Sequence, residues 1–450
     1  MSEPAGPTGS STGPRELRLE LRPEQREFHT RLLEHAHAPR YNYTSSDMLT
    51  ADTLAQVRRF ESEVRERPFW APGGHPEWLA EFTNRAYREV PYYRSYGRPP
   101  RRFEEVPTCG RETLRDEPWR LVPDSLDLRD MTLYTTSGTS GSSLSIPTDP
   151  VVSSLLLVLL ERLLEGAGVR LKRGGGAVAV ALVAMHSQTL TYPSISHYLD
   201  GAGFVKMNLA PQEWRDPEDR AAFLRDLAPG VVTGSPYAFE TMAALVPDLR
   251  PQALISSAVA LHPGQARRLE ALFECPVFDL YSMTEARAIG GRRPACEDDF
   301  ALLSPDLYVE VLGPNDEPLG PGEVGEIVIT GGRNRCLSLL RYRTGDRAAL
   351  TFVDGRPRLS RFEGREETFL LDASGERVPT LNVVGALKAL PLVGFSLVQM
   401  ADRSVVFEFC GACSPEQVQA PLEALFAGPV QVVRKSEWEG KPHRFRSKGL

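Results

Sequence analysis

The sequence predicts an α/β fold: a large N-terminal domain of mainly parallel sheets flanked by helices, then a small α+β C-terminal domain. Three observations predict it. Short apolar runs alternate with helix-like segments between residues 151 and 281, as in parallel βαβ units. From residue 306 short strands are split by Gly, Pro and Asn turns, which indicates a small antiparallel β subdomain. From residue 369 strand and helix signals mix again.

Each element of the first half follows from its local pattern. Residues 15–120 contain many Arg and Glu and few β-branched residues, which predicts mostly helix, and residues 91–94 begin a Pro/Arg-rich loop. The run 177–185 is continuously apolar and bounded by glycines, which is typical of a buried parallel strand. The other expected elements are strands at 230–233, 253–259 and 276–281 and helices at 151–166, 216–228 and 263–274.

The second half is expected to contain shorter strands. They are placed at 308–312, 326–330 and 347–352, and in the tail at 369–372, 404–409 and 430–434, with a helix at 415–426.

Composition excludes several classes of protein. The chain has 450 residues, 41% apolar and 25% charged, which is ordinary for two or three globular domains. A net charge of −7 argues against nucleic acid or an anionic membrane as the main partner. No signal peptide is visible, residues 1–14 are expected to be disordered, and the most apolar run, 151–160, is too short to span a bilayer.

Six cysteines are scattered along the chain, which is a reduced pattern and predicts a cytoplasmic location. Cys410 and Cys413 form a single C-x-x-C without a second pair or a His cluster nearby. We interpret this pair as packing, with redox or zinc use as the minority reading.

The segment 135–143 consists of Thr, Ser and Gly and follows an apolar-leaning run. Such a loop at a strand end can turn several backbone N–H groups toward one point and bind phosphate. A solvated linker is the alternative reading. The loop is not a Walker A motif, because it contains no Lys.

Two further segments place polar side chains after strands. Thr284 and Glu285 follow the expected strand 276–281, where α/β sheets bind ligands, and Glu can hold Mg²⁺. A helix N-cap with a first-turn acid is the alternative. Asp346 follows a Thr-Gly turn and could accept both hydroxyls of a ribose or satisfy its own turn.

Two cationic residues are further candidates for the site. Arg365 follows Gly364 and offers a planar, always-charged donor, or else it is part of a solvated surface pair. Lys441 lies between Gly440 and Pro442 on a flexible loop, or else belongs to a frayed basic terminus.

The order of these motifs resembles that of the acyl-adenylate-forming, or AMP-binding, superfamily: a Ser/Thr/Gly loop, Y-x-x-T-E, Y-R-T-G-D, G-R and a terminal G-K. A narrower likeness to the phenylacetate–coenzyme A ligases covers about residues 88–450. It rests on the segments 90–94, 112–116, 235–237, 279–281, 296–297 and 339–346.

The resemblance implies a large N-terminal domain, 15–363, and a small mobile C-terminal lid, 364–450. It implies a two-step reaction that uses ATP, Mg²⁺ and coenzyme A. A carboxylate attacks the α-phosphate to give an acyl adenylate and pyrophosphate, and a nucleophile, usually a thiol, then displaces AMP.

The resemblance also implies residue roles. Thr284 would hold the α-phosphate, Glu285 would hold Mg²⁺, and Lys441 would bridge the substrate carboxylate and the α-phosphate. Residues expected to hold the β- and γ-phosphates are Ser137, Gly138, Thr139, Ser140 and Gly141. Residues expected around the nucleoside are Asp279 at the adenine amino group, Tyr281 and Ser282 at the ring, Ser257 and Ala258 on its other face, and Asp346 and Arg365 at the ribose.

The chain departs from the family pattern in three places. The loop usually ends G-K-P, but here Ser142 follows Gly141, so phosphate affinity is weaker or an Arg elsewhere supplies the charge. The hinge usually reads G-R-x-D-D, but Thr368 occupies its pivot. A family segment rich in Gly is replaced by 372–379. Adenylation is therefore better supported than thiol transfer.

The acid is expected to face His186, Tyr192 and Tyr237, and aromatic walls suit an aryl or arylacetic acid. His186 could equally be a core histidine or a gate to the thiol channel. The leading hypothesis is an AMP-forming acid–thiol ligase. The alternatives are transfer to an amine or a carrier-protein thiol in a biosynthetic, secondary-metabolic pathway, or a non-catalytic nucleotide-binding relative. The sequence leaves a homodimer open.

Overall fold

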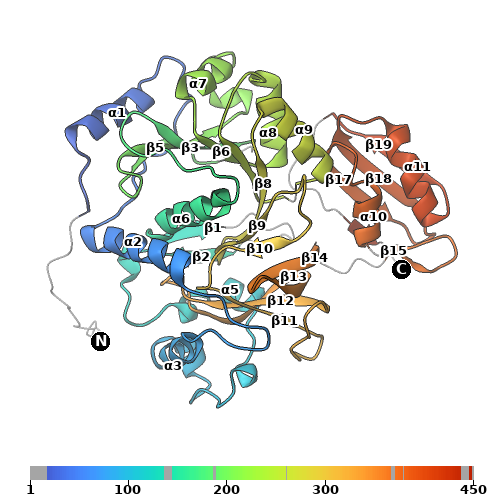
Figure 1. Cartoon of the computed structure of the whole chain (residues 1–450), viewed down its shortest axis with the longest axis horizontal. Helices are drawn as coiled ribbons and strands as arrows, with labels where there is room; N and C mark the ends of the chain where they lie inside the picture. Colours follow the sequence, from blue (N-terminus) through green and yellow to red (C-terminus); the bar gives the residue numbers. More distant parts are fainter. Residues whose placement is uncertain are drawn as a thin grey trace, which may run out of the picture.

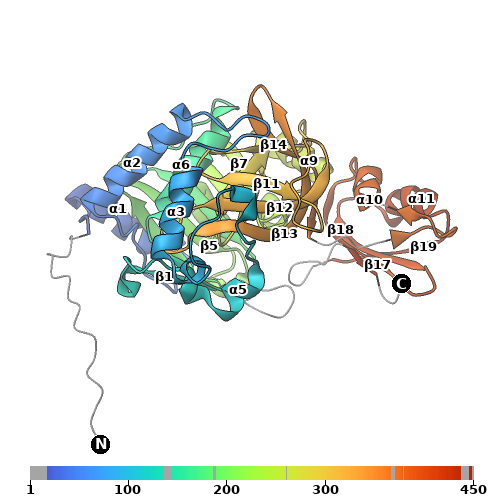
Figure 2. The same cartoon turned by 90° about the horizontal axis from the view of Figure 1, so that it is seen from below.

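The computed structural model describes residues 18–135, 144–185, 189–259, 261–365, 370–378, 380–436 and 445–447. They form a large body on one twelve-stranded sheet and a smaller unit on a four-stranded sheet (Figure 1). A second view shows the same arrangement, with the smaller unit at the end of the molecule opposite the first two helices (Figure 2).

Parallel strands form one half of the large sheet, which confirms the prediction from the apolar runs. They lie in the order β8-β7-β6-β3-β5, and β4 pairs antiparallel at the edge. Their bounds are β3 (Val178–Ala184), β4 (Tyr192–Ser196), β5 (Ala202–Asn208), β6 (Val231–Gly234), β7 (Ala253–Ser256) and β8 (Val277–Met283).

Helices cover both faces of this half, because the strands are apolar on both sides. Val183 and Val232 pack toward α7, α8 and α9, whereas Val180 and Ile255 pack toward α2 and α6. No helix among the described residues is both long and apolar enough to cross a membrane. The helices are α2 (Ala51–Glu66), α6 (Val152–Glu165), α7 (Asp219–Leu227), α8 (Pro236–Leu245) and α9 (Pro263–Phe273).

The antiparallel strands expected beyond residue 306 are present, and they continue the parallel strands in the same sheet. The β8–β9 hairpin makes the transition between the two halves. The bounds are β9 (Arg287–Arg292), β10 (Phe300–Leu302), β11 (Tyr308–Leu312), β12 (Val324–Gly331), β13 (Leu339–Val353) and β14 (Arg356–Arg365).

One local expectation is wrong: Asp346 does not follow a turn but lies inside the long strand β13. Gly345 has a φ of +77°, a left-handed conformation that glycine adopts without a steric penalty. Thr344 is fully buried; its hydroxyl donates to the carbonyl of Ile327 at 2.8 Å and accepts from the Asp346 N–H at 3.0 Å. The Thr-Gly pair therefore shapes an irregular strand rather than a reversal.

The N-terminal region is helical only in part, with long connections between its helices. Residues 91–94 form a short helix rather than opening a loop. The helices are α1 (Pro23–Leu33), α3 (Leu79–Glu89), α4 (Pro91–Arg94) and α5 (Arg111–Asp116), and β1 (Thr132–Thr135) pairs with β2 (Ser145–Thr148) in a separate hairpin. Four short 3₁₀ helices are Phe103–Glu105, Pro118–Leu121, Leu128–Asp130 and Pro211–Glu213.

The smaller unit has its own apolar core, which includes Leu397, Phe407 and Leu422. The strands predicted near 404–409 and 430–434 and the helix 415–426 are confirmed, whereas β17 and α10 were not predicted. The elements are β15 (Leu370–Leu371), β16 (Arg377–Val378), α10 (Thr380–Ala386), β17 (Leu392–Gln399), β18 (Val405–Gly411), α11 (Pro415–Phe426), β19 (Val430–Arg434) and β20 (Phe445–Ser447). The domain boundary at 364 stays a prediction.

A buried ion pair beside β13 predicts pH-dependent stability. Glu310 lies 3.4 Å from Nε of Arg341, and burial raises the pKa of Glu310 from 4.5 to about 7. The folded chain holds this proton more tightly, so the stabilisation is present below pH 4.5 and is lost as pH rises through about 7. Between pH ~5 and pH ~8 the wild type should lose roughly 2–3 kcal/mol more unfolding free energy than Glu310→Gln. Urea unfolding at both pH values measures this difference, and equal losses would contradict it.

Candidate active site

The Thr284–Glu285 motif lies in the turn of the β8–β9 hairpin, so the helix N-cap reading is wrong. Glu285 is only 3% exposed. Its Oε1 accepts a hydrogen bond from the Tyr342 hydroxyl at 2.9 Å and faces Nη1 of Arg111 at 3.4 Å. Burial raises the pKa of Tyr342 well above its ordinary value, so the phenol remains a donor. Three separate segments thus orient one carboxylate.

The Glu285 carboxylate fits a magnesium ligand. Both described contacts go to Oε1, and among the described residues no hydrogen bond occupies Oε2. No cluster of three or more His, Cys, Asp or Glu in the described ranges could hold a metal alone. Mg²⁺ is commonly held by one or two carboxylates and substrate phosphates, which matches a single acid beside the residues that are expected to bind a nucleotide.

Tyr281 and Asp346 are brought together from distant parts of the sequence. The Tyr281 hydroxyl donates to Oδ2 of Asp346 at 2.8 Å, and both side chains are under 10% exposed. The Tyr281 ring meets the edge of Phe362, with ring centroids 4.7 Å apart. Asp346 is also paired across the sheet with the backbone of Arg365, whose side chain is outside the described part. Residues expected at the adenine and the ribose therefore adjoin.

Asp279 has a cationic partner that the sequence did not reveal. Its Oδ2 accepts from Nη2 of Arg292 at 3.0 Å, and the Arg292 guanidinium lies 4.3 Å from the centre of the Phe300 ring. Asp279 and Arg292 are opposite each other in the β8–β9 pairing. The sequence does not reveal this pair, because a regular hairpin that turns at 284–286 would place Gly291 opposite Asp279, and only a register shift between Tyr281 and Ser282 brings Arg292 there.

The segment that is expected to face the adenine, Ser257 and Ala258, lies at the carboxyl end of β7, next to β8. The N–H of Ser257 donates to the carbonyl of Gly234 at 2.9 Å. Ala258 is exposed and has a φ of +70°, which is uncommon for a residue with a side chain and often marks a functional site. Ser282 and Thr284 are half-buried in and after β8.

The two described aromatic residues that are expected at the acid lie on different elements of the fold. Tyr192 is on the edge strand β4, where it meets Tyr43 edge-to-face at 5.6 Å. Burial raises the pKa of Tyr192 to about 12, with a smaller contribution from Tyr134. Tyr237 is on α8 instead, where a Cβ added to Gly394 of β17 would lie 2.0 Å from its hydroxyl. The smaller unit therefore packs directly on Tyr237.

The smaller unit docks on α9 through close backbone contact. A Cβ on Gly264 would lie 2.2 Å from the carbonyl oxygen of Leu390. Nη2 of Arg267 donates to the carbonyl of Lys388 at 3.2 Å, and Nζ of Lys388 pairs with Asp298 at 2.5 Å. A backbone atom cannot give way as a flexible side-chain end can, so only glycine permits this approach.

Gly264→Ala is therefore expected to separate the smaller unit from α9. Amide hydrogen exchange should increase along α9 and β17 and stay constant in β3. Gly385→Ala is the matched control, because it lies in α10 of the same unit and its added Cβ would meet nothing within 4 Å. Unchanged exchange in Gly264→Ala would contradict the docking role.

Several predicted residues lie outside the described residues: Ser137, Gly138, Thr139, Ser140, Gly141, His186 and Lys441. Their roles remain predictions from the sequence.

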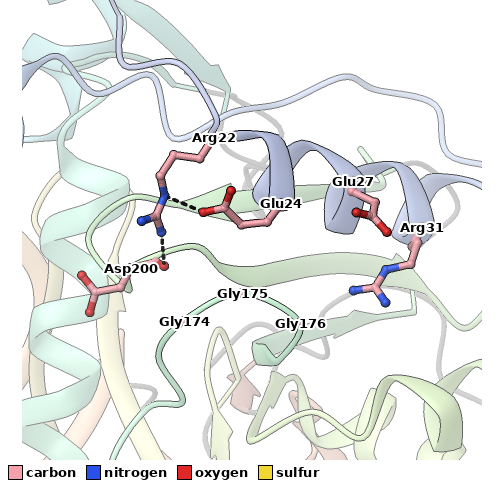
Figure 3. Close-up of a pocket in the computed structure, with 8 residues that line it drawn as sticks. All are labelled: Arg22, Glu24, Glu27, Arg31, Gly174, Gly175, Gly176 and Asp200. Carbon is pink, nitrogen blue, oxygen red and sulfur yellow. Dashed lines mark hydrogen bonds and ion pairs between the residues drawn. The ribbon is translucent and has the colours of Figure 1, made fainter.

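A separate pocket of about 540 Å³ lies between α1 and the glycine-rich turn before β3 (Figure 3). Its lining includes Arg22, Arg31 and Gly175, and none of the predicted site residues. Arg22 is already paired with Glu24 at 3.1 Å. This pocket does not belong to the site around Glu285.

The chain is similar to known proteins of one enzyme family. The family described as AMP-binding enzyme matches residues 167–334. The chain is 24% identical over 314 residues to the phenylacetate-coenzyme A ligase of Escherichia coli (strain K12), covering 64% of this chain and 69% of that protein. It is 24% identical over 197 residues to the phenylacetate-coenzyme A ligase of Pseudomonas putida, covering 41% of this chain but only 44% of that relative.

Solved structures support the fold. A 2-hydroxyisobutyryl-CoA ligase in the postadenylation state, in complex with 2-HIB-AMP, superposes with a TM-score of 0.62 at 14% identity, covering 87% of this chain and 89% of that one. The same ligase in the thioesterification state gives 0.51 at 15% identity, covering 90% and 94%. These identities establish the α/β fold alone. The family match over residues 167–334 and the two sequence relatives support the phenylacetate–coenzyme A ligase-like branch of the AMP-binding superfamily, and with it an AMP-forming acid–thiol ligase.

Proposed function

We propose that this protein uses ATP to activate a carboxylic acid as an acyl adenylate and then transfers the acyl group to coenzyme A. The observation that carries the proposal is the hydrogen bond from Tyr281 to Asp346, together with that from Tyr342 to Glu285, because both connect the β8–β9 hairpin to β13, which is not its neighbour in the sheet. It joins two residues that are 65 positions apart in the sequence and would bind the adenine and the adjoining ribose of one nucleotide.

Each described side chain has a part in this proposal. Asp346 would accept the ribose hydroxyls, and Asp279, oriented by Arg292, would face the adenine amino group. Tyr281, Ser282, Ser257 and Ala258 would line the nucleoside. Thr284 would donate to the α-phosphate and Glu285 would hold Mg²⁺, which supplies charge stabilisation to the phosphates. Such a reaction depends on positioning and electrostatics, which these buried polar groups can provide.

The remaining roles follow from the resemblance. The residues Ser137 to Gly141 would hold the outer phosphates, Arg365 would lie beside the ribose, and Lys441 would bridge the acid and the α-phosphate. His186, Tyr192 and Tyr237 would border the acid. Half-buried aromatic rings such as Tyr192 favour an aryl or arylacetic substrate.

Free thiols support a cytoplasmic location. All six cysteines are among the described residues and each is a free thiol, four of them buried. Proteins of oxidising compartments commonly pair their cysteines.

One observation favours a different acceptor of the acyl group. The family's Gly-rich segment is replaced by a tight turn in which Asp372 accepts hydrogen bonds from the N–H groups of Ser374 and Glu376. Because this segment relates to the thiol-transfer conformation in the family, an amine or a carrier-protein thiol in a secondary-metabolic pathway is the alternative acceptor.

Pyrophosphate release over a panel of aryl acids, first alone and then with coenzyme A, tests both steps. The proposal expects release with at least one acid, and conversion to a thioester when coenzyme A is added. Release that coenzyme A neither accelerates nor converts would favour the alternative acceptor. No release with any acid would contradict adenylation of the acids tested.

A further inference from the structure

The Ser/Thr/Gly loop lies in a long stretch without cations. From residue 130 to residue 161 the chain contains no Lys or Arg. A triphosphate is strongly anionic, and guanidinium groups are well suited to bind it. A cation near the loop must therefore come from another part of the chain.

Arg287 lies at the right place along the β8–β9 hairpin. Asp279, Tyr281 and Met283 follow one another on the same strand, and Met283 is opposite Arg287. If Asp279 faces the adenine, the later residues of β8 are expected to lie closer to the phosphates of the nucleotide. Arg287 is opposite the last of these residues, Met283. The backbone φ of Arg287 is +60°, a strained conformation for a residue with a long side chain.

The Arg287 guanidinium joins the loop's starting strand to the carboxylate that would hold Mg²⁺. Its Cζ lies 4.7 Å from the centre of the Tyr134 ring, within the range of a cation–π contact. Tyr134 belongs to β1, which ends at Thr135, immediately before the loop. Glu285 is two residues before Arg287 and interacts with it electrostatically.

The Arg287 side chain is hydrogen-bonded to Tyr134, but two of its three nitrogen atoms are buried without such a contact. Among the described residues, neither Nε nor Nη2 has a hydrogen-bond partner. Leaving buried charged donors unsatisfied is costly, so such donors call for an explanation. Other arginines of this region each have a carboxylate partner: Arg292 donates to Asp279, Arg111 pairs with Glu285, and Arg333 donates to Asp306.

We propose that Arg287 binds the β- and γ-phosphates of ATP and supplies the positive charge that the Ser/Thr/Gly loop lacks. The inference rests on the proposed adenylation. It makes Arg287 a ligand of the leaving pyrophosphate, not of the nucleoside.

The test compares ligands that contain or lack these phosphates. Isothermal titration calorimetry measures binding of ATP, pyrophosphate and AMP to the wild type, Arg287→Met and Arg287→Lys. In Arg287→Met, ATP and pyrophosphate should bind about 10- to 100-fold more weakly, as expected for a charge-assisted hydrogen bond, and AMP should bind as before. Arg287→Lys should recover part of the loss.

Two measurements separate this role from a structural one. Arg120→Met removes a similar but exposed contact, with Cζ 5.5 Å from the Tyr92 ring, and should leave all three affinities unchanged. Arg287→Met should unfold at no lower a temperature than the wild type, because it removes a charged side chain whose buried Nε and Nη2 lack a hydrogen-bond partner among the described residues. Equal weakening of ATP and AMP, or no weakening of either, would overturn the inference while leaving adenylation standing. A wild type that binds neither nucleotide would instead contradict the proposed function.

Discussion

Lys441→Ala should lose adenylation while a preformed acyl adenylate is still consumed by the thiol. The lysine is expected to bridge the attacking carboxylate and the α-phosphate, where negative charge develops only in the first half-reaction. Removing such a stabilising group typically costs about 10²- to 10³-fold in rate. Acid-dependent pyrophosphate release measures the first half-reaction, and thioester formation from synthetic acyl-AMP measures the second.

Lys435→Ala is the matched control for this experiment. Lys435 is a lysine of the smaller unit, six residues before Lys441 in the sequence, and its Nζ pairs with Glu408 at 3.0 Å on a partly exposed surface. Exposed ion pairs contribute at most about 1 kcal/mol, so both half-reactions should keep their rates. If Lys441→Ala slowed both half-reactions equally, the bridging role would be wrong.

The parallel half of the large sheet was predictable because buried strands carry a strong signal. The run around Val180 is apolar on both faces and is bounded by glycines, so length and composition were sufficient. The long strand β13 was predicted only in its second half, since Arg341, Arg343 and Gly345 are atypical of a strand. The charges of the two arginines are satisfied by partners that are distant in the sequence, such as Glu326 for Arg343, and no local pattern reveals these partners.

The candidate site was predictable as a set of motifs but not as a set of contacts. Order along the chain identified Glu285 and Asp346, whereas their partners Tyr342 and Tyr281 depend on the register of the sheet. Tyr342 is 57 residues from Glu285, and local spacing carries no information about such a pair. Arg287 could not be distinguished by sequence from an ordinary strand residue. It is set apart by its buried Nε and Nη2 atoms, for which the described part of the chain offers no hydrogen-bond partner.

Glu285→Gln should reduce the rate of adenylation by about 10²-fold and raise the concentration of Mg²⁺ needed for half-maximal rate. Gln keeps the shape and can still accept from Tyr342, but its amide is neutral and is a poor ligand for a hard cation. Because Glu285 also faces Arg111 at 3.4 Å, the substitution leaves that arginine without its charge partner. Magnesium titrations of pyrophosphate release measure both effects.

A second buried trio in the same chain distinguishes lost metal binding from lost packing. Glu161 accepts hydrogen bonds from the Tyr198 hydroxyl and from Arg173, as Glu285 does from Tyr342 while facing Arg111, but it lies on α6 away from the nucleotide motifs. Glu161→Gln should therefore lower the unfolding temperature and leave the magnesium dependence unchanged. If both variants lost activity in parallel with stability, Glu285 would be a structural acid. A magnesium shift confined to Glu285→Gln would support its role as the ligand that positions the metal on the phosphates.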